Sequence, residues 1–204
     1  MITIIDYGVG NLASIQNMLR KAGINSIISK DKKNIGSAAK ILLPGMGAFD
    51  NCMVKFNESG FREIIETKVL AEKVPVLGIC IGLQMLMESS EEGNLPGLGW
   101  VKGNTIAFNR KLIKEELKIP NMGWLEITGK KKSGLLTNLE GARFYFAHSF
   151  HVQPDDKSNE LITANYGYEF TAGIEKNNIL GVQFHPEKSH RYGMVLLKNF
   201  AANY

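Results

Sequence analysis

The stretch VPVLGICIGLQM, residues 74–85, runs from an apolar segment into a helical pattern through a cysteine flanked by glycines. The apolar segment predicts a buried strand, and the spaced apolar residues after the cysteine predict a helix. Cys80 lies at the junction, with Gly78 two residues before it and Gly82 two residues after it. A side chain on a sharp strand-to-helix turn is crowded by its neighbours, and glycines at these positions relieve the crowding. The spacing therefore predicts a nucleophile elbow that carries sulfur in place of oxygen.

Strand-like runs and helical patterns alternate along the first half of the chain. The pattern over residues 11–23 predicts a helix with Asn11 as its N-cap and Gly23 as its stop, and the pattern over 49–73 is a helix broken near Ser59-Gly60. Strands that alternate with helices favour a parallel sheet covered on both faces. The predicted fold class is α/β, with an open, largely parallel, doubly wound sheet. Its predicted strands are residues 2–7, 26–30, 40–45 and 74–80.

The second half consists mostly of short strand-like pieces separated by turns that contain Gly and Asn, and it closes with a helical pattern over 191–204. Such pieces favour a mixed or antiparallel extension of the sheet. No internal repeat, low-complexity tract or linker interrupts the sequence. We therefore expect one α/β domain over residues 1–204, a length within the usual range for a single domain.

The composition is that of a folded globular chain, with 44% hydrophobic and 22% charged residues. Its apolar stretches are too short to span a bilayer, and the N-terminus lacks a basic segment and a cleavage site. We therefore expect a cytoplasmic protein without a membrane partner. The net charge is +4, but no aromatic residues interleave with the run Lys130–Lys132, so we expect no nucleic-acid partner.

The two cysteines, Cys52 and Cys80, lie far apart and without metal-ligand spacing. This pattern indicates no disulfide framework and no metal site, and we expect no cofactor. Cys52 lies in a helical pattern near Phe49 and Met53, which predicts that it packs in the core.

Cys80 needs a base before it can be assigned as a nucleophile, because a free cysteine more often packs as a small hydrophobe. His185 follows a strand-like run and precedes Pro186 and Glu187. Proline fixes the chain direction, and a carboxylate beside an imidazole can hold its tautomer. Alone, this His-Pro-Glu sequence is more often a surface turn. Together with the elbow, it favours nucleophilic acyl chemistry by a triad of Cys80, His185 and Glu187.

The segment LLPGMGAF, residues 42–49, ends a predicted strand with two glycines that flank Met46. Glycines allow backbone N–H groups to turn toward a ligand, although the same pattern is also common in strand-end turns. The helix after Cys80 directs the N–H of Ile81 toward an oxyanion that develops on the same ligand. We expect an oxyanion hole built from these backbone groups. Its candidate residues are Gly45, Met46, Gly47 and Ile81.

Three motifs taken together resemble the class I (triad) glutamine amidotransferases: GICIGLQ (78–84), LPGMGAF (43–49) and HPEKS (185–189). Three further stretches, IIDYGVGNLASI, MGWLE and FYFAHSFHV, narrow the resemblance to the glutaminase subunit of imidazole glycerol phosphate synthase. The similarity runs from Ile4 to about Phe200. It therefore covers nearly the whole chain.

The resemblance implies that Cys80 attacks the side-chain amide of L-glutamine and forms a γ-glutamyl thioester and ammonia. His185 would act as base and then as acid, and Glu187 would orient it. The resemblance also implies a partner-dependent backbone flip in the 45–47 segment. The residues that match positions for the amino-acid portion of glutamine are Gln84, His148, Ser149 and Phe150.

The resemblance further implies a partner, a (β/α)8-barrel synthase subunit that forms a heterodimer with this chain. The barrel would receive the ammonia and make imidazole glycerol phosphate and AICAR in histidine biosynthesis. Asn11, Trp124 and Lys188 match family positions at or near the partner interface. From the residues alone, Trp124 could equally pack in the core, and Lys188 could equally be a solvated surface lysine.

Two departures from the family pattern keep an alternative open. The family typically has His-Met-Gly-Trp-Asn where this chain has Asn121-Met-Gly-Trp-Leu125, and histidine-pathway members often have GLGLIPG where this chain has GLGWVKG (97–103). Neither change touches the triad, but both could alter the partner surface. The main alternative is a paralogous glutaminase that supplies ammonia for amidation of a bacterial surface sugar. A regulatory module with an inactive triad and a related α/β cysteine hydrolase are less favoured.

Overall fold

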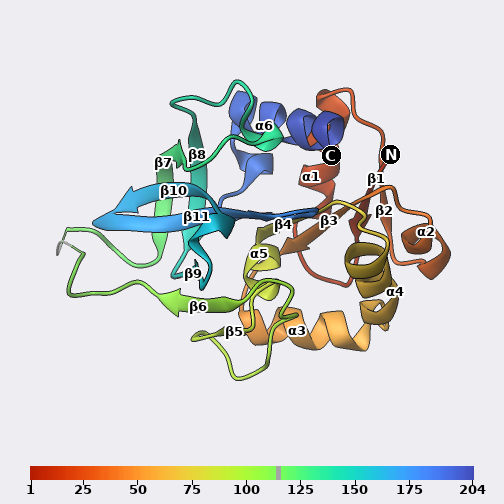
Figure 1. Cartoon of the computed structure of the whole chain (residues 1–204), viewed down its shortest axis with the longest axis horizontal. Coiled ribbons are helices and arrows are strands. Elements are labelled where there is room, and N and C mark those ends of the chain that lie inside the picture. Colours follow the sequence, from red (N-terminus) through yellow and green to blue (C-terminus); the bar gives the residue numbers. More distant parts are fainter. Residues whose placement is uncertain (114–115) are drawn as a thin grey trace.

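Five parallel strands form one half of the sheet in the computed structural model, which describes residues 1–113 and 116–204 (Figure 1). β1, β4 and β12 are buried along their whole length, as expected for parallel strands with both faces covered. The predicted α/β class is confirmed. In spatial order the strands are β2 (Ser26–Ser29), β1 (Ile2–Ile5), β3 (Lys40–Gly45), β4 (Val76–Cys80) and β12 (Ile179–Val182).

Helices cover both faces of this parallel half (Figure 1). α1 (Leu12–Lys21) and α6 (His190–Asn203) lie on one face, and α3 (Phe49–Glu58), α4 (Arg62–Glu66) and α5 (Ile81–Met85) lie on the other. A π-helical turn, Thr67–Ala71, continues α4, and a short α2 (Lys32–Gly36) precedes β3.

Local sequence signals set the helix ends. The Asn11 side chain caps α1 by accepting a hydrogen bond from the Ser14 N–H at 3.3 Å, as predicted. The predicted helix over 49–73 is broken where expected, because α3 ends at Glu58 and Gly60 takes a φ of +67°. Such a positive φ is accessible to glycine at little steric cost.

The second half forms the antiparallel extension, but its last strand returns to the parallel half. β11 pairs antiparallel with β12, and the sheet continues through β10, β7 and β8, while β9 pairs with β11 and β6. The remaining strands are β5 (Ser89–Ser90), β6 (Gly103–Ala107), β7 (Asn121–Gly129), β8 (Arg143–His148), β9 (Phe150–Pro154), β10 (Glu160–Tyr166) and β11 (Tyr168–Lys176). The return of β12 beside β4 brings the C-terminal quarter of the chain to the end of the cysteine strand. Short 3-10 turns lie at Gly134–Leu136, Lys157–Asn159 and Pro186–Lys188.

Aromatic packing ties the extension to the segment that follows β12. The rings of Phe144 in β8 and Phe184 stack with centroids 4.0 Å apart, and both side chains are fully buried. This contact fixes the backbone immediately before His185.

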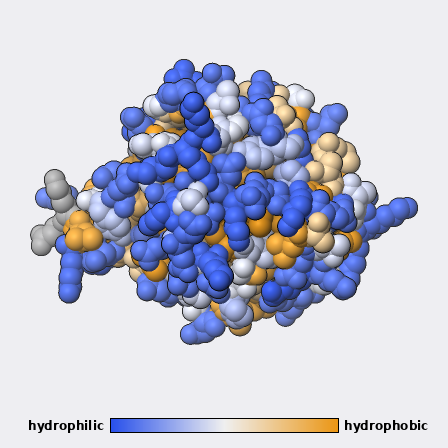
Figure 2. Space-filling model, in the orientation of Figure 1, coloured by the Kyte–Doolittle hydropathy of each residue, from blue (hydrophilic) through white to orange (hydrophobic). Residues whose placement is uncertain are grey.

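The outer surface seen in Figure 2 is mainly hydrophilic, with small apolar groups between charged side chains. Among the residues that the structure describes, none of the helices is both long and apolar enough to cross a membrane.

Candidate active site

Cys80 occupies a strained turn between β4 and α5. Its backbone has a φ of 56° and a ψ of −113°, and its side chain is only 4% exposed. A Cβ atom on Gly78 would lie 2.6 Å from the carbonyl oxygen of Gly82, and one on Gly82 would overlap the carbonyl oxygen of Leu43 in β3. The two glycines thus allow backbone-to-backbone packing of the turn against its neighbours. The predicted strand–turn–helix elbow is present.

His185 follows β12 and Cys80 ends β4, and these two strands are parallel neighbours. Val182 of β12 pairs with Ile79 of β4, so both strands end at the same edge of the sheet. The backbone around His185 is fixed on both sides: its N–H donates to the Tyr145 carbonyl at 2.9 Å, and its carbonyl accepts from the Ser189 hydroxyl at 2.6 Å.

His185 and Glu187 form a buried pair. The Nδ1 of His185 lies 2.8 Å from Oε1 of Glu187, and both side chains are about 95% or more buried. Burial lowers the pKa of His185, but hydrogen bonds with Cys80 and Glu187 and their negative charges outweigh it and raise that pKa to about 10. The imidazole is therefore protonated at neutral pH, and its Nδ1 is occupied by Glu187. Its Nε2 remains for the sulfur of Cys80.

Cys80 and His185 line a cavity of about 240 Å³ at the carboxyl ends of the parallel strands. Sites for drug-sized ligands usually measure about 300–1,000 Å³, so this volume suits a small molecule such as a single amino acid. The cavity is lined by Met46, Gly47, Cys80, Ile81, Gln84, Glu92, Pro120, Ala147, His148, Ser149, Phe150, His185 and Lys188.

The predicted oxyanion residues approach Cys80 from the neighbouring strand. Gly45 ends β3 and pairs with Cys80 across the sheet, behind the cavity wall. Met46 and Gly47 line the cavity together with Ile81, the first residue of α5. Gly47 has a φ of +93°, and Met46 is 46% exposed. This segment is therefore at the mouth of the cavity.

Gln84 lines the cavity and is itself almost fully buried. Its Nε2 donates to the Phe150 carbonyl at 3.2 Å and to Oε1 of Gln183 at 3.1 Å. Its Oε1 is buried and finds no partner in the described part of the chain. A buried acceptor without a partner lowers stability. Gln183 also donates to the sulfur of Cys80 at 3.8 Å.

His148 shapes the cavity wall as a neutral ring. Its Nδ1 lies 2.7 Å from the Phe150 carbonyl, which only accepts, and its Nε2 lies 3.1 Å from Nδ2 of Asn121, which only donates. These partners select the neutral tautomer with the proton on Nδ1. Burial lowers the pKa of His148 to about 3, so the ring stays neutral at physiological pH. Asn121 thus supplies the donor at a position where the family resemblance leads us to expect a histidine.

The sequence patterns did not single out Glu92 or Gln183, and they marked Asn121 only as a departure from the family pattern. The Glu92 carboxylate lines the cavity and accepts from the Phe49 N–H at 3.0 Å. Burial raises its pKa, and repulsion from Asp50 adds to that rise. A carboxylate here suits the α-ammonium group of an amino acid. The only sequence signal was the Glu91–Glu92 pair, which does not tell a ligand-facing carboxylate from a solvated one.

The three residues predicted for a partner interface are not all in the cavity. Lys188 lines it, with Nζ 5.6 Å from the centroid of the Tyr145 ring. Trp124 is 37% exposed and stacks on His190, with ring centroids 5.4 Å apart and planes at 4°. Asn11 is exposed and caps α1. Core packing is therefore excluded for Trp124, and the interface role of these residues stays a prediction.

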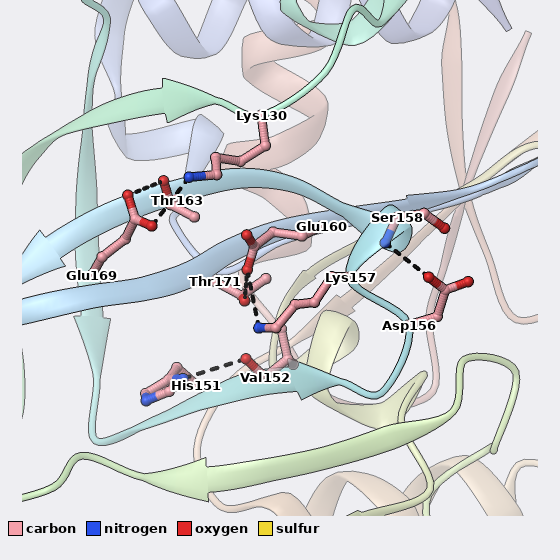
Figure 3. Close-up of polar contacts among 10 residues, drawn as sticks. All are labelled: Lys130, His151, Val152, Asp156, Lys157, Ser158, Glu160, Thr163, Glu169 and Thr171. Atoms are coloured by element: carbon pink, nitrogen blue, oxygen red, sulfur yellow. Dashed lines mark hydrogen bonds and ion pairs between the residues drawn. The ribbon is translucent and has the colours of Figure 1, made fainter.

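Among the larger cavities of the described residues, two lie at the antiparallel extension, and neither is lined by a cysteine. One, of about 510 Å³, lies over the extension, and its carboxylates are already paired (Figure 3). Glu169 binds Lys130 and Thr163, each at 3.1 Å, and Glu160 binds Thr171 and Lys157. The other, of about 610 Å³, lies beside the run Lys130–Lys132. The reactive groups are therefore concentrated at the smaller cavity.

Comparison with known proteins agrees with this geometry. A family model described as glutamine amidotransferase class-I matches residues 3–204. The chain is 49% identical over 201 residues to the imidazole glycerol phosphate synthase subunit HisH 2 of Methanococcus maripaludis, covering 98% of each chain. It is 48% identical over 202 residues to the HisH subunit of Bdellovibrio bacteriovorus, covering 98% of this chain and 99% of that one.

Solved structures share the fold at low identity. The structure of PurLQS from Thermotoga maritima aligns with a TM-score of 0.70 at 19% identity, covering 98% of this chain and 96% of that chain. A crystal structure of a glutamine amidotransferase aligns equally well, at 0.70 and 17% identity, covering 97% and 98%. With its motifs, its fold and a family match over nearly its whole length, this chain belongs to the class-I glutamine amidotransferases.

Proposed function

We propose that this protein is the glutaminase subunit of imidazole glycerol phosphate synthase and hydrolyses L-glutamine to glutamate and ammonia. The observation that carries the proposal is the meeting of Cys80 with the His185–Glu187 pair, at adjacent strand ends, in a cavity that suits one amino acid. Relatives at 48–49% identity over 98% of the chain carry that subunit's name. Histidine biosynthesis is therefore the pathway, and the surface-sugar alternative is not favoured.

In the first half-reaction, the Cys80 thiolate attacks the side-chain amide carbon of glutamine. An imidazolium beside a cysteine favours the thiolate, and the raised pKa of His185 keeps its ring protonated. The tetrahedral intermediate collapses as His185 gives this proton to the departing nitrogen. Ammonia leaves, and a γ-glutamyl thioester remains on Cys80.

In the second half-reaction, the now neutral His185 takes a proton from water, and the resulting hydroxide adds to the thioester carbon. The C–S bond breaks, glutamate leaves, and the thiolate–imidazolium pair is restored. Glu187 keeps the ring oriented through both steps by its hydrogen bond with Nδ1.

Backbone N–H groups stabilise the oxyanion of both intermediates. We assign this role to Ile81 and to the segment Gly45–Gly47, which lies beside Cys80. The Oε1 of Gln84 and the carboxylate of Glu92 would receive the α-ammonium group of glutamine. The turn at residues 148–150 would hold its α-carboxylate.

The ammonia would pass to a partner subunit, which we propose is a (β/α)8 barrel. Ammonia released into water at neutral pH is mostly protonated and no longer nucleophilic, so a sheltered path between two active sites conserves it. We propose that Asn11, Trp124 and Lys188 face this partner, that residues 1–204 act as one domain, and that the complex works in the cytoplasm. Lys188 links the catalytic cavity to the proposed partner surface. It lines the cavity, and it contacts the ring of Tyr145, which packs against Trp124.

The direct test measures glutamate release from glutamine by the chain alone and with a candidate barrel partner, for wild type and for Cys80→Ala. We expect low activity alone, strong stimulation by the correct partner, and a loss of at least about 10⁴-fold in Cys80→Ala. Unchanged turnover in Cys80→Ala would contradict the mechanism. Equal turnover with and without each partner would contradict the partner dependence.

A further inference from the structure

The segment Pro44–Gly47 is held from its buried side by two groups that the triad does not use. The Tyr7 hydroxyl donates a hydrogen bond to the Pro44 carbonyl at 2.5 Å. The Cys52 thiol in α3 donates to the Met46 carbonyl at 3.5 Å. Tyr7 is 5% exposed and Cys52 is fully buried. Alternate carbonyls of one short segment are thus anchored by side chains that are far apart in sequence.

Both anchors carry a proton to donate at neutral pH. Burial raises the pKa of the Tyr7 hydroxyl well above its ordinary value, and the neighbouring Cys52 adds to that rise. Burial also raises the pKa of the Cys52 thiol, although its hydrogen bonds to Met46 and Tyr7 oppose that rise. Each group is therefore neutral, and its hydrogen can reach a carbonyl oxygen.

The Cys52 contact fixes the direction of an amide in the candidate oxyanion hole. In a trans peptide the C=O and the N–H point in opposite directions. Because the Met46 carbonyl points to Cys52, the Gly47 N–H of the same peptide points away from it. Met46 and Gly47 line the catalytic cavity, whereas Cys52 does not. The N–H is thus directed away from the core side, where Cys52 lies.

The segment has little else to hold it in this orientation. Met46, Gly47 and Ala48 are exposed, and nothing lies within 4 Å of the position that a Gly47 side chain would occupy. Glycine at a φ of +93° also has wide backbone freedom. A hydrogen bond to the preceding carbonyl is therefore a main restraint on this peptide.

We propose that Cys52, assisted by Tyr7, is a positioning residue that holds the Met46–Gly47 peptide with its N–H directed to the oxyanion of the glutamine reaction, which leaves the expected partner-dependent flip to the Gly45–Met46 peptide. Cys52 acts through the Met46 carbonyl and touches no substrate. The inference rests on the proposed glutaminase function. It extends the prediction that Cys52 is only a packing residue.

The experiment compares Cys52→Ala with Cys52→Ser in the complex with the synthase partner. Alanine removes the donor, whereas serine keeps an O–H donor at the same atom position. We expect kcat, expressed per Cys80 site titrated by alkylation, to fall roughly 10- to 100-fold in Cys52→Ala, with KM for glutamine unchanged. Cys52→Ser should retain most of the wild-type kcat. Counting active sites removes the effect of any unfolded protein.

A second pair of variants tests the other anchor. Tyr7→Phe removes the donor to Pro44 and should also lower kcat without changing KM. Tyr204→Phe is the matched control, because it removes a hydroxyl that binds Glu175 and Ser133 away from the cavity. Its kcat should equal that of wild type.

Three outcomes would overturn the inference: equal kcat in Cys52→Ala and wild type, equal losses in the alanine and serine variants, or a change confined to KM. A failure of the proposed function gives a different result, because turnover would then survive in Cys80→Ala. The positioning role of Cys52 would then be rejected together with the proposed function.

Discussion

Cys80 holds a backbone conformation that its own side chain disfavours. A φ of 56° with a ψ of −113° costs an L-residue of order 1–3 kcal/mol, and the surrounding turn must supply that energy. The Gly78–Gly82 contact and the packing against Leu43 provide the restraint. Strain of this kind at a cysteine agrees with the proposal that the position serves chemistry and not stability.

This strain predicts an unusual order of stability at position 80. Cys80→Gly should have a free energy of unfolding about 1–3 kcal/mol higher than Cys80→Ala, because glycine adopts the observed φ without strain. Denaturant titration of the two inactive variants measures the difference. An alanine variant as stable as the glycine variant would show that the turn is unstrained.

Glu187 sets the protonation of His185. Burial alone lowers the pKa of the imidazole, and Glu187 and Cys80 together raise it to about 10. Glu187→Gln should therefore move the alkaline limb of the kcat/KM profile to lower pH and reduce kcat by about 10²- to 10⁴-fold. The kcat/KM of wild type and of Glu187→Gln, recorded from pH 6 to 10, measures this shift. An unshifted limb would exclude the His185–Glu187 pair as its origin.

At the scale of elements, α5 lies against the ends of two strands with no side chain between them. The Cβ position of Gly82 overlaps the Leu43 carbonyl of β3, and that of Gly45 overlaps the backbone of α5. These strand–helix contacts keep Cys80 and Gly45 in one fixed arrangement. The elbow is therefore a property of β3, β4 and α5 together.

Gly82→Ala should separate α5 from β3 and lower the free energy of unfolding by at least about 2 kcal/mol, since a backbone atom cannot move as a side chain can. Gly36→Ala is the matched control in α2, where the added methyl meets only the flexible end of Ile64 at 3.1 Å. It should change stability by less than about 1 kcal/mol. Equal effects of the two substitutions would disprove the close approach.

Elements with local signals were predictable from sequence. Asn11 caps its helix and the break at Ser59-Gly60 ends another, because both depend on neighbouring residues only. The motifs named Cys80, His185 and Glu187, which the structure brings to one edge of the sheet, and their catalytic roles stay a prediction. The contacts of Glu92, Gln183 and Asn121 were not predictable, because their partners lie at least about 27 residues away in sequence and meet them only in the fold. The return of β12 beside β4 likewise depends on long-range strand pairing, which the local patterns do not encode.

At the scale of the whole molecule, two buried histidines shape the pH dependence of stability in opposite ways. The pKa of His148 is lowered from 6.5 to about 3, so its contribution is present above pH 6.5 and is lost as the pH falls toward 3. The pKa of His185 is raised from 6.5 to about 10, so its contribution is present below pH 6.5 and is lost as the pH rises through 10.

These two groups therefore predict a maximum of stability near pH 6.5, with limbs of up to about 1.4 kcal/mol per pH unit for each group. Denaturant titrations from pH 5 to 9 should show that His148→Gln makes the acid limb shallower and His185→Gln makes the alkaline limb shallower, with buried His151, whose pKa is also lowered, keeping part of the acid limb. If each substitution lowered stability equally at every pH, the opposite shifts would be disproved.

The proposed function requires that Cys80 is the nucleophile that attacks the side-chain carbon of glutamine. The most direct measurement reacts the complex with a glutamine analogue that carries an electrophilic carbon in place of the amide, and then locates the label by peptide mass spectrometry. We expect one label per chain, on Cys80 alone, with protection by glutamine and no label in Cys80→Ala. Label on Cys52, or full glutaminase activity in an enzyme that takes no label on Cys80, would contradict it.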